Sequence, residues 1–161
     1  MANGIGSAVT RKVTERLTGS PTEGSAVGAL MEGGSTGGAP LRVANAAAEL
    51  MERAGATQYP VVSVYCEKVV NDLREKFRSF SGVVQIAIEV RHSQDRMDGL
   101  EAALEAQADA VTAALTASRG DWGDGAYYAG GYQVTFGRIA RGGRNFSQAA
   151  KVTFEVGVSR S

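Results

Sequence analysis

The sequence has only one cysteine, one histidine and three prolines in 161 residues, and neither sign of charge is in excess. Because Cys66 stands alone, no disulfide can form within the chain, and a reducing compartment suits its folding. Lys plus Arg equals Asp plus Glu at 17 each. The charge of the whole chain therefore does not drive strong binding to nucleic acid or to an anionic membrane, and an electrostatic partner must meet a local patch.

Long apolar runs are missing as well. No stretch approaches the roughly 20 apolar residues that a membrane span requires, and the opening residues 1–6 lack the apolar segment of a signal peptide. We therefore expect a soluble, non-secreted protein with no membrane contact. With 43% hydrophobic residues, the chain has room for one domain with a true core, and it is too short for a second core of equal size.

Glycine is abundant but unevenly placed: of 21 residues, nine lie in residues 1–40 and eight in residues 120–143. Residues 5–18 have an apolar side chain at every fourth position, which predicts a short amphipathic helix. Residues 24–40 bury too little to hold one conformation alone and predict a flexible arm. The predicted organisation is an N-terminal helix and glycine-rich arm over residues 1–40, followed by a single α+β domain over residues 41–161.

Hydrophobic periodicity within that domain predicts helices and strands in turn. Strand-like composition or alternation predicts four strands, at residues 61–66, 83–91, 132–136 and 150–158. Helical spacing predicts helices at residues 41–54 and 69–77 and a long helix at residues 97–115. The last two strands form a hairpin around residues 137–145. This order predicts a mixed or antiparallel sheet of about four strands with helices on one face.

The residue types that carry out catalysis occur singly. Cys66 lies within an apolar segment and His92 is the only imidazole, so they form no nucleophile and base signature. Within one subunit they cannot supply four zinc ligands, although a symmetric interface could pool them. Residues 28–34 have glycine spacing but lack the Lys-Ser or Lys-Thr of a phosphate-binding loop. Residues 121–125 lack calcium-loop spacing and predict a tight surface turn. We therefore expect no catalytic residue, no cofactor, no bound metal and no enzymatic activity.

Charge is nevertheless segregated locally. The start of the long predicted helix has four acidic residues, Asp98, Glu101, Glu105 and Asp109. The closing hairpin has three arginines at every third position, Arg138, Arg141 and Arg144. The pattern favours complementary contacts between subunits or with another protein, while two separate solvated surfaces are the alternative. Trp122 begins an aromatic group that flanks the basic loop and is a further candidate for the interface. Basic and aromatic residues together also leave open a single-stranded nucleic-acid site.

Over about residues 41–158, the chain resembles the tail terminator (tail completion) proteins of long-tailed bacteriophages and, more loosely, other phage neck proteins. The residues that carry the resemblance are the first strand at 59–65 and the second strand ending at 86–90. The long helix from Met97 and the closing hairpin through Phe136 and Phe154 complete it. The glycine-rich first 40 residues are longer than that family usually shows.

The resemblance implies a structural virion protein that forms a homo-oligomeric ring, classically a hexamer, at the head-proximal end of the tail. The implied partners are the tail tube protein and the head connector or head-completion protein, and DNA only passes through the lumen. The implied location is the tail or neck of the virion, after assembly in the host cytoplasm. The alternatives are another neck or head-completion protein or a small nucleic-acid-binding module.

Overall fold

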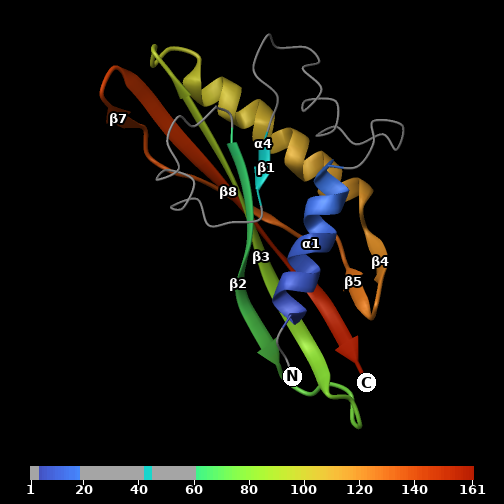
Figure 1. Ribbon diagram of the computed structural model, residues 1–161. Coiled ribbons are helices and arrows are strands. Elements are labelled where there is room, and N and C mark those ends of the chain that lie inside the picture. The colour runs from blue at the N-terminus through green and yellow to red at the C-terminus, as the bar shows by residue number, and fades with distance from the viewer. Residues whose placement is uncertain (1–3, 19–41, 45–60) are drawn as a thin grey trace.

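The computed structural model describes residues 4–18, 42–44 and 61–161 and has an α+β fold (Figure 1). Two helices and eight strands lie in these residues. In chain order they are α1 (Ile5–Thr18), β1 (Arg42–Ala44), β2 (Val61–Asn71), β3 (Phe80–Gln94), α4 (Leu100–Ala117), β4 (Gly120–Gly123), β5 (Ala126–Tyr128), β6 (Gln133–Phe136), β7 (Ala140–Gly142) and β8 (Asn145–Arg160).

The sheet is built around two long antiparallel strands, β3 and β8. They pair along all of β3, from Phe80 opposite Arg160 to Gln94 opposite Phe146. On the other edge of β3 lies β2, antiparallel to it, and β1 runs parallel to β2. The far edge of β8 pairs with three short strands, β7, β6 and β5, and β4 pairs with β5. The two long strands therefore form the frame on which every other described strand is placed.

The predicted α+β class is confirmed, and each of the four predicted strands matches an observed strand, although β6 begins at Gln133, one residue after its predicted start. The predicted closing hairpin is present as β6 paired with β8. The sheet is more divided than about four strands, because β1, β4, β5 and β7 add short segments of three or four residues. These segments are too short for an alternation of apolar residues to mark them in the sequence.

Both periodic helices at residues 5–18 and 97–115 are present, but the second begins later than its pattern suggests. Gly99, with φ 79°, is the N-cap of α4, and no side chain caps this end of the helix. Asp98 precedes the cap, and its carbonyl accepts a hydrogen bond from Gln94 Nε2 at 2.8 Å. Asp98 and Glu101 therefore form no capping box, although their spacing of three residues resembles one.

The helix predicted at residues 69–77 is wrong. Val69 and Val70 continue strand β2 opposite Val84 and Val83, and the chain then turns back into β3. Two β-branched residues in sequence favour the extended conformation, which overrides the weak helical spacing. The helix predicted at residues 41–54 is also wrong over residues 42–44, which form β1, and the rest of that range lies outside the described residues.

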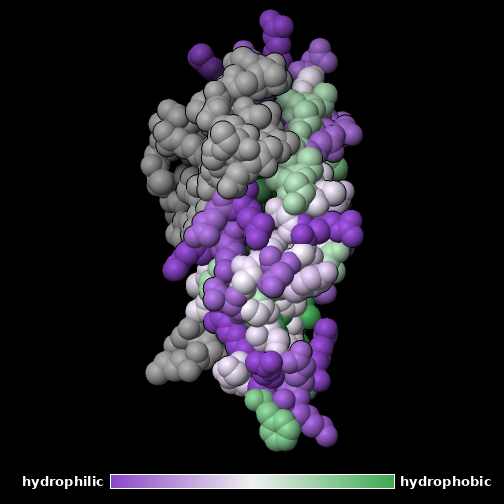
Figure 2. All heavy atoms as spheres, turned by 90° about the vertical axis from the view of Figure 1, so that its right-hand side faces the viewer, coloured by the Kyte–Doolittle hydropathy of each residue, from purple (hydrophilic) through white to green (hydrophobic). Residues whose placement is uncertain are grey.

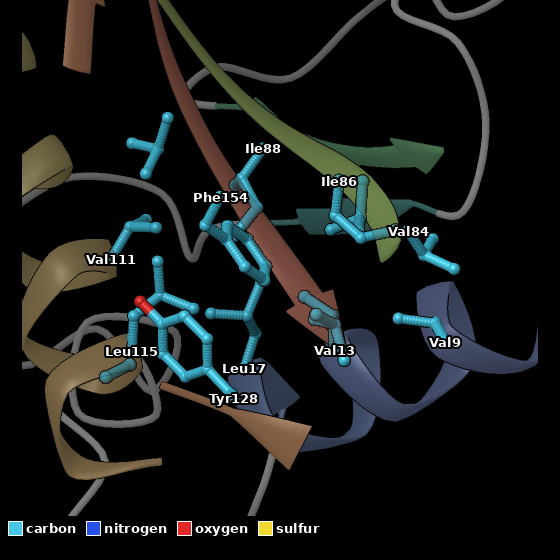
Figure 3. Close-up of a cluster of buried hydrophobic side chains, with 14 of the residues drawn as sticks. Val9, Val13, Leu17, Val84, Ile86, Ile88, Val111, Leu115, Tyr128 and Phe154 are labelled. Carbon is cyan, nitrogen blue, oxygen red and sulfur yellow. The ribbon is translucent and has the colours of Figure 1, made fainter. Parts of the chain in front are cut away.

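One face of the sheet, here called the covered face, packs against α1 and α4 (Figures 1 and 3). Alternate side chains of β3 and β8 point into the core between sheet and helices, which explains the period of two in their sequences. Figure 3 labels ten residues of this core, from the strands and from the helices that cover them: Val9, Val13, Leu17, Val84, Ile86, Ile88, Val111, Leu115, Tyr128 and Phe154. Because α1 belongs to this core, the helix predicted within the N-terminal segment packs on the domain. The predicted boundary at residue 40 lies outside the described residues.

The opposite face of the sheet, here called the open face, is polar along the same strands. A β-bulge between Cys66 and Lys68 adds Glu67 to β2. Glu67 then pairs with Lys151 of β8 and accepts a hydrogen bond from Gln85 Nε2 at 3.0 Å. Further along, Glu89 pairs with Arg91 at 3.0 Å. The open face thus carries cross-strand polar contacts where the covered face carries hydrophobic packing.

Candidate interaction surfaces

The acidic row on α4 is exposed as predicted. Its spacing of three and four residues places its members along one side of the helix, and all four side chains are exposed. None of the four forms an ion pair with another described residue. The row consists of Asp98, which precedes the helix, and Glu101, Glu105 and Asp109 within it.

The three arginines of the closing hairpin are exposed as well, but the loop that holds them is not wholly irregular. Arg141 lies in β7, which pairs with the start of β8. Its guanidinium carbon lies 5.6 Å from the ring centroid of Phe146, a cation–π contact. Arg138 and Arg144 flank this strand. Within residues 4–18, 42–44 and 61–161, none of the three arginines has a carboxylate partner.

The acidic row and the basic loop lie toward the same end of the molecule. Gln94, the last residue of β3, pairs with Phe146 next to the basic loop. The Gln94 side chain also donates to the carbonyls of Arg96 and Asp98, at 2.7 Å and 2.8 Å. These contacts bring the start of α4 close to the β7–β8 turn, as Figure 1 shows. The two sets are neighbours without pairing inside the subunit.

Trp122 is buried rather than presented at a surface. Only 6% of it is exposed, its indole N–H donates to the Ser118 carbonyl at 2.6 Å, and its ring lies 5.5 Å from that of Tyr128. The Arg16 guanidinium covers the ring at 4.8 Å. Aromatic residues beside a basic loop suggested an interface, but the short strand β4 turns this side chain into the core between α1 and α4.

Cys66 and His92 do not form a reactive pair. Cys66 lies opposite Ile86, and His92 lies six residues further along β3, which corresponds to about 20 Å of extended chain. Burial raises the pKa of the Cys66 thiol and lowers the pKa of the His92 imidazole, so each is held in its neutral form. No group of three or more metal-ligating side chains occurs in the described part of the chain.

The turn predicted at residues 121–125 is present as the link between β4 and β5. Asp124 adopts φ 54° in it, and the Asp121 carboxylate accepts a hydrogen bond from the Gly123 amide at 2.8 Å. Lys12 of α1 pairs with Asp124 at 3.1 Å and donates to the Trp122 carbonyl at 3.1 Å. The turn therefore helps to fix α1 on the sheet.

Two exposed hydrophobic groups are relevant to the surface, and the first of them was missed in the sequence. The first is the β2–β3 turn with Leu73 and Phe77, which the sequence pattern had placed in the predicted helix at residues 69–77. The second lies beside the open face, at Tyr127 and Tyr132. The only signal available for the first group was the strand-forming Val69–Val70 pair, which makes a turn the natural place for the residues that follow.

No protein-family model matches this chain, and no curated protein matches it either. Neither helix of the described residues has the length and apolarity to cross a bilayer. The functional argument therefore depends on the surfaces described above.

Proposed function

We propose that this chain is a structural virion protein, a phage tail terminator that assembles into a ring and joins the tail to the head connector. The observation that carries the proposal is the pair of opposite charge sets that lie at one end of the subunit without neutralising each other. A ring is a closed heterologous assembly, in which each subunit presents two different surfaces to its neighbours. The acidic row and the basic loop provide two such surfaces.

The energetics suit an assembly part. Each exposed ion pair contributes only about 0.2–1 kcal/mol. A single contact between the acidic row and the basic loop therefore stabilises the assembly little, and the same contact repeated at every subunit boundary of a ring adds up. Such a contact needs no cofactor and no turnover, in keeping with a chain in which catalytic residue types are scarce. Both helices of the described residues lie on one face of the sheet, and the basic loop lies exposed at its end, where it can contact a neighbour.

The partners in this proposal are the subunit's own copies, the tail tube protein and the head connector or head-completion protein. A ring of about six copies, located in the tail or neck after assembly in the host cytoplasm, is the form that the family resemblance implies. DNA slides through its lumen, for which a subunit of zero net charge is suitable because it does not grip the phosphate backbone.

A second function has a specific observation in its favour. Tyr132 and Phe136 are 46% and 43% exposed, and Phe136 closely precedes Arg138 in the chain. Exposed aromatic rings beside arginines are the ordinary composition of a single-stranded nucleic-acid site. A neck or head-completion protein with a different ring position is the third reading, and it uses the same charged surfaces.

The test is to replace Arg138, Arg141 and Arg144 together with alanine. We expect a normally folded subunit, judged by circular dichroism and thermal melting, that no longer forms rings in light scattering and negative-stain images. A matched control replaces three exposed basic residues elsewhere, Arg11, Lys68 and Arg119. Rings that form equally well in low and high salt after the triple change would contradict this interface.

A rescue experiment sharpens the assignment. Reversing the loop to glutamates should abolish assembly, and reversing the acidic row to lysines in the same chain should partly restore it. Salt-sensitive binding of single-stranded DNA by the monomer, lost in the triple alanine variant, would favour the nucleic-acid module instead.

A further inference from the structure

The β2–β3 turn presents hydrophobic side chains at the lower end of the molecule, where it projects beyond the sheet (Figure 1). Leu73 is 59% exposed and Phe77 is fully exposed. Figure 2 shows hydrophobic atoms at this same lower tip, surrounded by polar ones. We call Leu73 and Phe77 the tip. An aromatic ring held out in water loses the burial energy that its size would otherwise provide.

The turn is fixed by an internal set of hydrogen bonds. The Asn71 side chain accepts from the amides of Leu73 and Ser81, at 3.4 Å and 3.0 Å, and donates to the Ser79 carbonyl at 3.1 Å. The Ser81 hydroxyl accepts from the Glu75 amide at 3.1 Å. The turn is therefore built to hold one shape, which is the property of a preorganised contact surface.

Holding that shape carries a cost in the backbone. Leu73 and Phe77 have φ values of 48° and 67°, in a region that bulky residues rarely occupy because the conformation is strained for them. Glycine or asparagine would satisfy these positions without the strain. The sequence instead keeps two large apolar side chains at positions where they are strained and exposed.

A groove of about 610 Å³ lies on the open face, toward the end from which the tip projects. Its volume falls within the roughly 300–1,000 Å³ typical of binding pockets. Tyr127, 57% exposed, and Tyr132, 46% exposed, supply apolar surface. The remaining lining comes from β3 and β8 and includes Gln85, Thr153 and Glu155.

The tip of a subunit does not fill the groove of the same subunit. Of the turn, Arg74 is the residue that lines the groove, while Phe77 points into solvent with its whole surface exposed. A contact between the two surfaces must therefore join two molecules. Because tip and groove are different surfaces, such a contact is heterologous and leads to a ring or a filament.

The turn and the groove each have a charged side chain without an ion-pair partner among the described residues, and these two charges are opposite. Within the turn, Asp72 pairs with Arg74 at 2.6 Å and Glu75 pairs with Arg78 at 3.2 Å. Lys76, next to Phe77, has no ion pair with any described residue. In the groove, exposed Glu155 is likewise without a cationic partner among the described residues. A tip seated in the groove would bring these two charges toward each other.

We propose that the tip of one copy docks into the open-face groove of the next copy, with Phe77 as its aromatic anchor. The inference deepens the proposed function, on which it rests, by naming a contact that closes the ring. The match of one protruding aromatic to one groove, and of Lys76 to Glu155, favours a second copy over a membrane surface. A buried aromatic in a pocket is the usual centre of an interface.

The test uses two variants of the full chain. Phe77→Asn removes the ring and tolerates the positive φ, so folding is preserved, and Tyr132→Lys fills the groove with a charge that repels Lys76. Sedimentation over a concentration series should show wild-type oligomers, and each variant should associate at least about 30-fold more weakly. Ala106→Asn, at an exposed position on α4, is the matched control and should behave as wild type.

Mixing the two variants gives the decisive result. The Phe77→Asn chain keeps an intact groove and the Tyr132→Lys chain keeps an intact tip, so the mixture should form dimers that neither chain forms alone. The exchange Lys76→Glu with Glu155→Lys should restore association that each single reversal weakens. Failure of the mixture to dimerise, or a monomeric wild type at every concentration, would overturn the inference.

Two further outcomes separate this inference from the proposed function. Rings that survive both Phe77→Asn and Tyr132→Lys would overturn the docking while leaving a tail terminator in place. Rings that depend on tip and groove but fail to complete tails would sustain the docking and contradict the virion role.

Binding of the wild type to phosphatidylserine vesicles, lost with Phe77→Asn and accompanied by a monomeric wild type, would assign the tip to a membrane and overturn the docking.

Discussion

The two faces of the sheet are made by alternate residues of the same strands, and they differ in character. On the covered face, Val84, Ile86 and Ile88 of β3 are fully buried beneath the helices. On the open face, Gln85 and Glu89 of the same strand make hydrogen bonds and ion pairs with their neighbours. The comparison teaches that one face stabilises the subunit by hydrophobic packing, while the other carries polar side chains that can serve contacts outside it.

The free energies on the two faces differ in scale. Burying a large side chain contributes about 1.5–3 kcal/mol, whereas an exposed cross-strand ion pair contributes about 0.2–1 kcal/mol. Substitutions on the open face therefore cost little stability, and selection there can act on what the surface binds. The proposed assembly function would use this separation, because an interface can then change without unfolding the subunit.

The largest expected effect comes from the centre of the covered face. Phe154 is 3% exposed, and its ring meets that of Tyr128 at 5.3 Å in an edge-on geometry (Figure 3). Phe154→Ala should lower the free energy of unfolding by about 3–5 kcal/mol through the cavity it leaves. The measurement is urea denaturation followed by circular dichroism.

The matched control is the next residue in the chain, whose side chain lies on the other face. Glu155→Ala should change the free energy of unfolding by no more than about 0.5 kcal/mol. Similar losses for the two variants would show that the open face contributes to the fold as much as the core does, and the comparison would fail.

The covered face was readable from the sequence, and the reason is physical. Strict alternation of apolar and polar residues at residues 83–91 and 150–158 is typical of a strand with one buried face. Apolar residues at every fourth position predicted α1 in the same way. In each of these segments local pattern and tertiary packing agree, so the fold class followed from the pattern alone.

The candidate surfaces were only partly readable. The charge sets of α4 and the basic loop could be seen as runs of like charge, but their proximity depends on the β3–β8 register, which a single sequence does not reveal. The tip was missed because Leu73 and Phe77 adopt positive φ without the glycine or asparagine that usually marks such positions. Trp122 was misplaced because a strand as short as β4 has no period to show which way a side chain points.

A smaller effect concerns alkaline pH and the covered face. Burial raises the pKa of Tyr128 to about 12 from its ordinary value of 10.0. A folded-state pKa above the unfolded value means that the stabilisation is complete below pH 10 and is lost as the pH rises toward 12. The free energy of unfolding should therefore fall between pH 10 and 12, as measured by urea denaturation at several pH values.

Replacing the tyrosine isolates its part of that fall. Tyr128→Phe should lose about 0.5–1.5 kcal/mol at neutral pH, because the hydroxyl no longer donates to the Gly131 carbonyl at 3.1 Å. It should also flatten the decline above pH 10, and Tyr127→Phe is the control at the exposed neighbouring position. An unchanged decline in Tyr128→Phe would mean that this hydroxyl does not titrate with unfolding.

The smallest effect is expected on the open face, at the ion pair of Lys151 with Glu67. The hydrogen bond between the Lys151 and Glu67 side chains is the main cause that raises the pKa of Lys151 above its ordinary value of 10.5. The stabilisation is therefore complete below pH 10.5 and disappears as the pH rises through the folded-state pKa.

A double-mutant cycle with Lys151→Met and Glu67→Gln should give a coupling of about 0.2–1 kcal/mol at pH 7. That coupling should shrink in high salt, because the lysine side chain is 40% exposed, and it should vanish above the folded-state pKa. A coupling as large as the Phe154→Ala loss would show that charge, rather than hydrophobic packing, holds β2 and β8 against β3, and the two faces would no longer differ in the way the structure indicates.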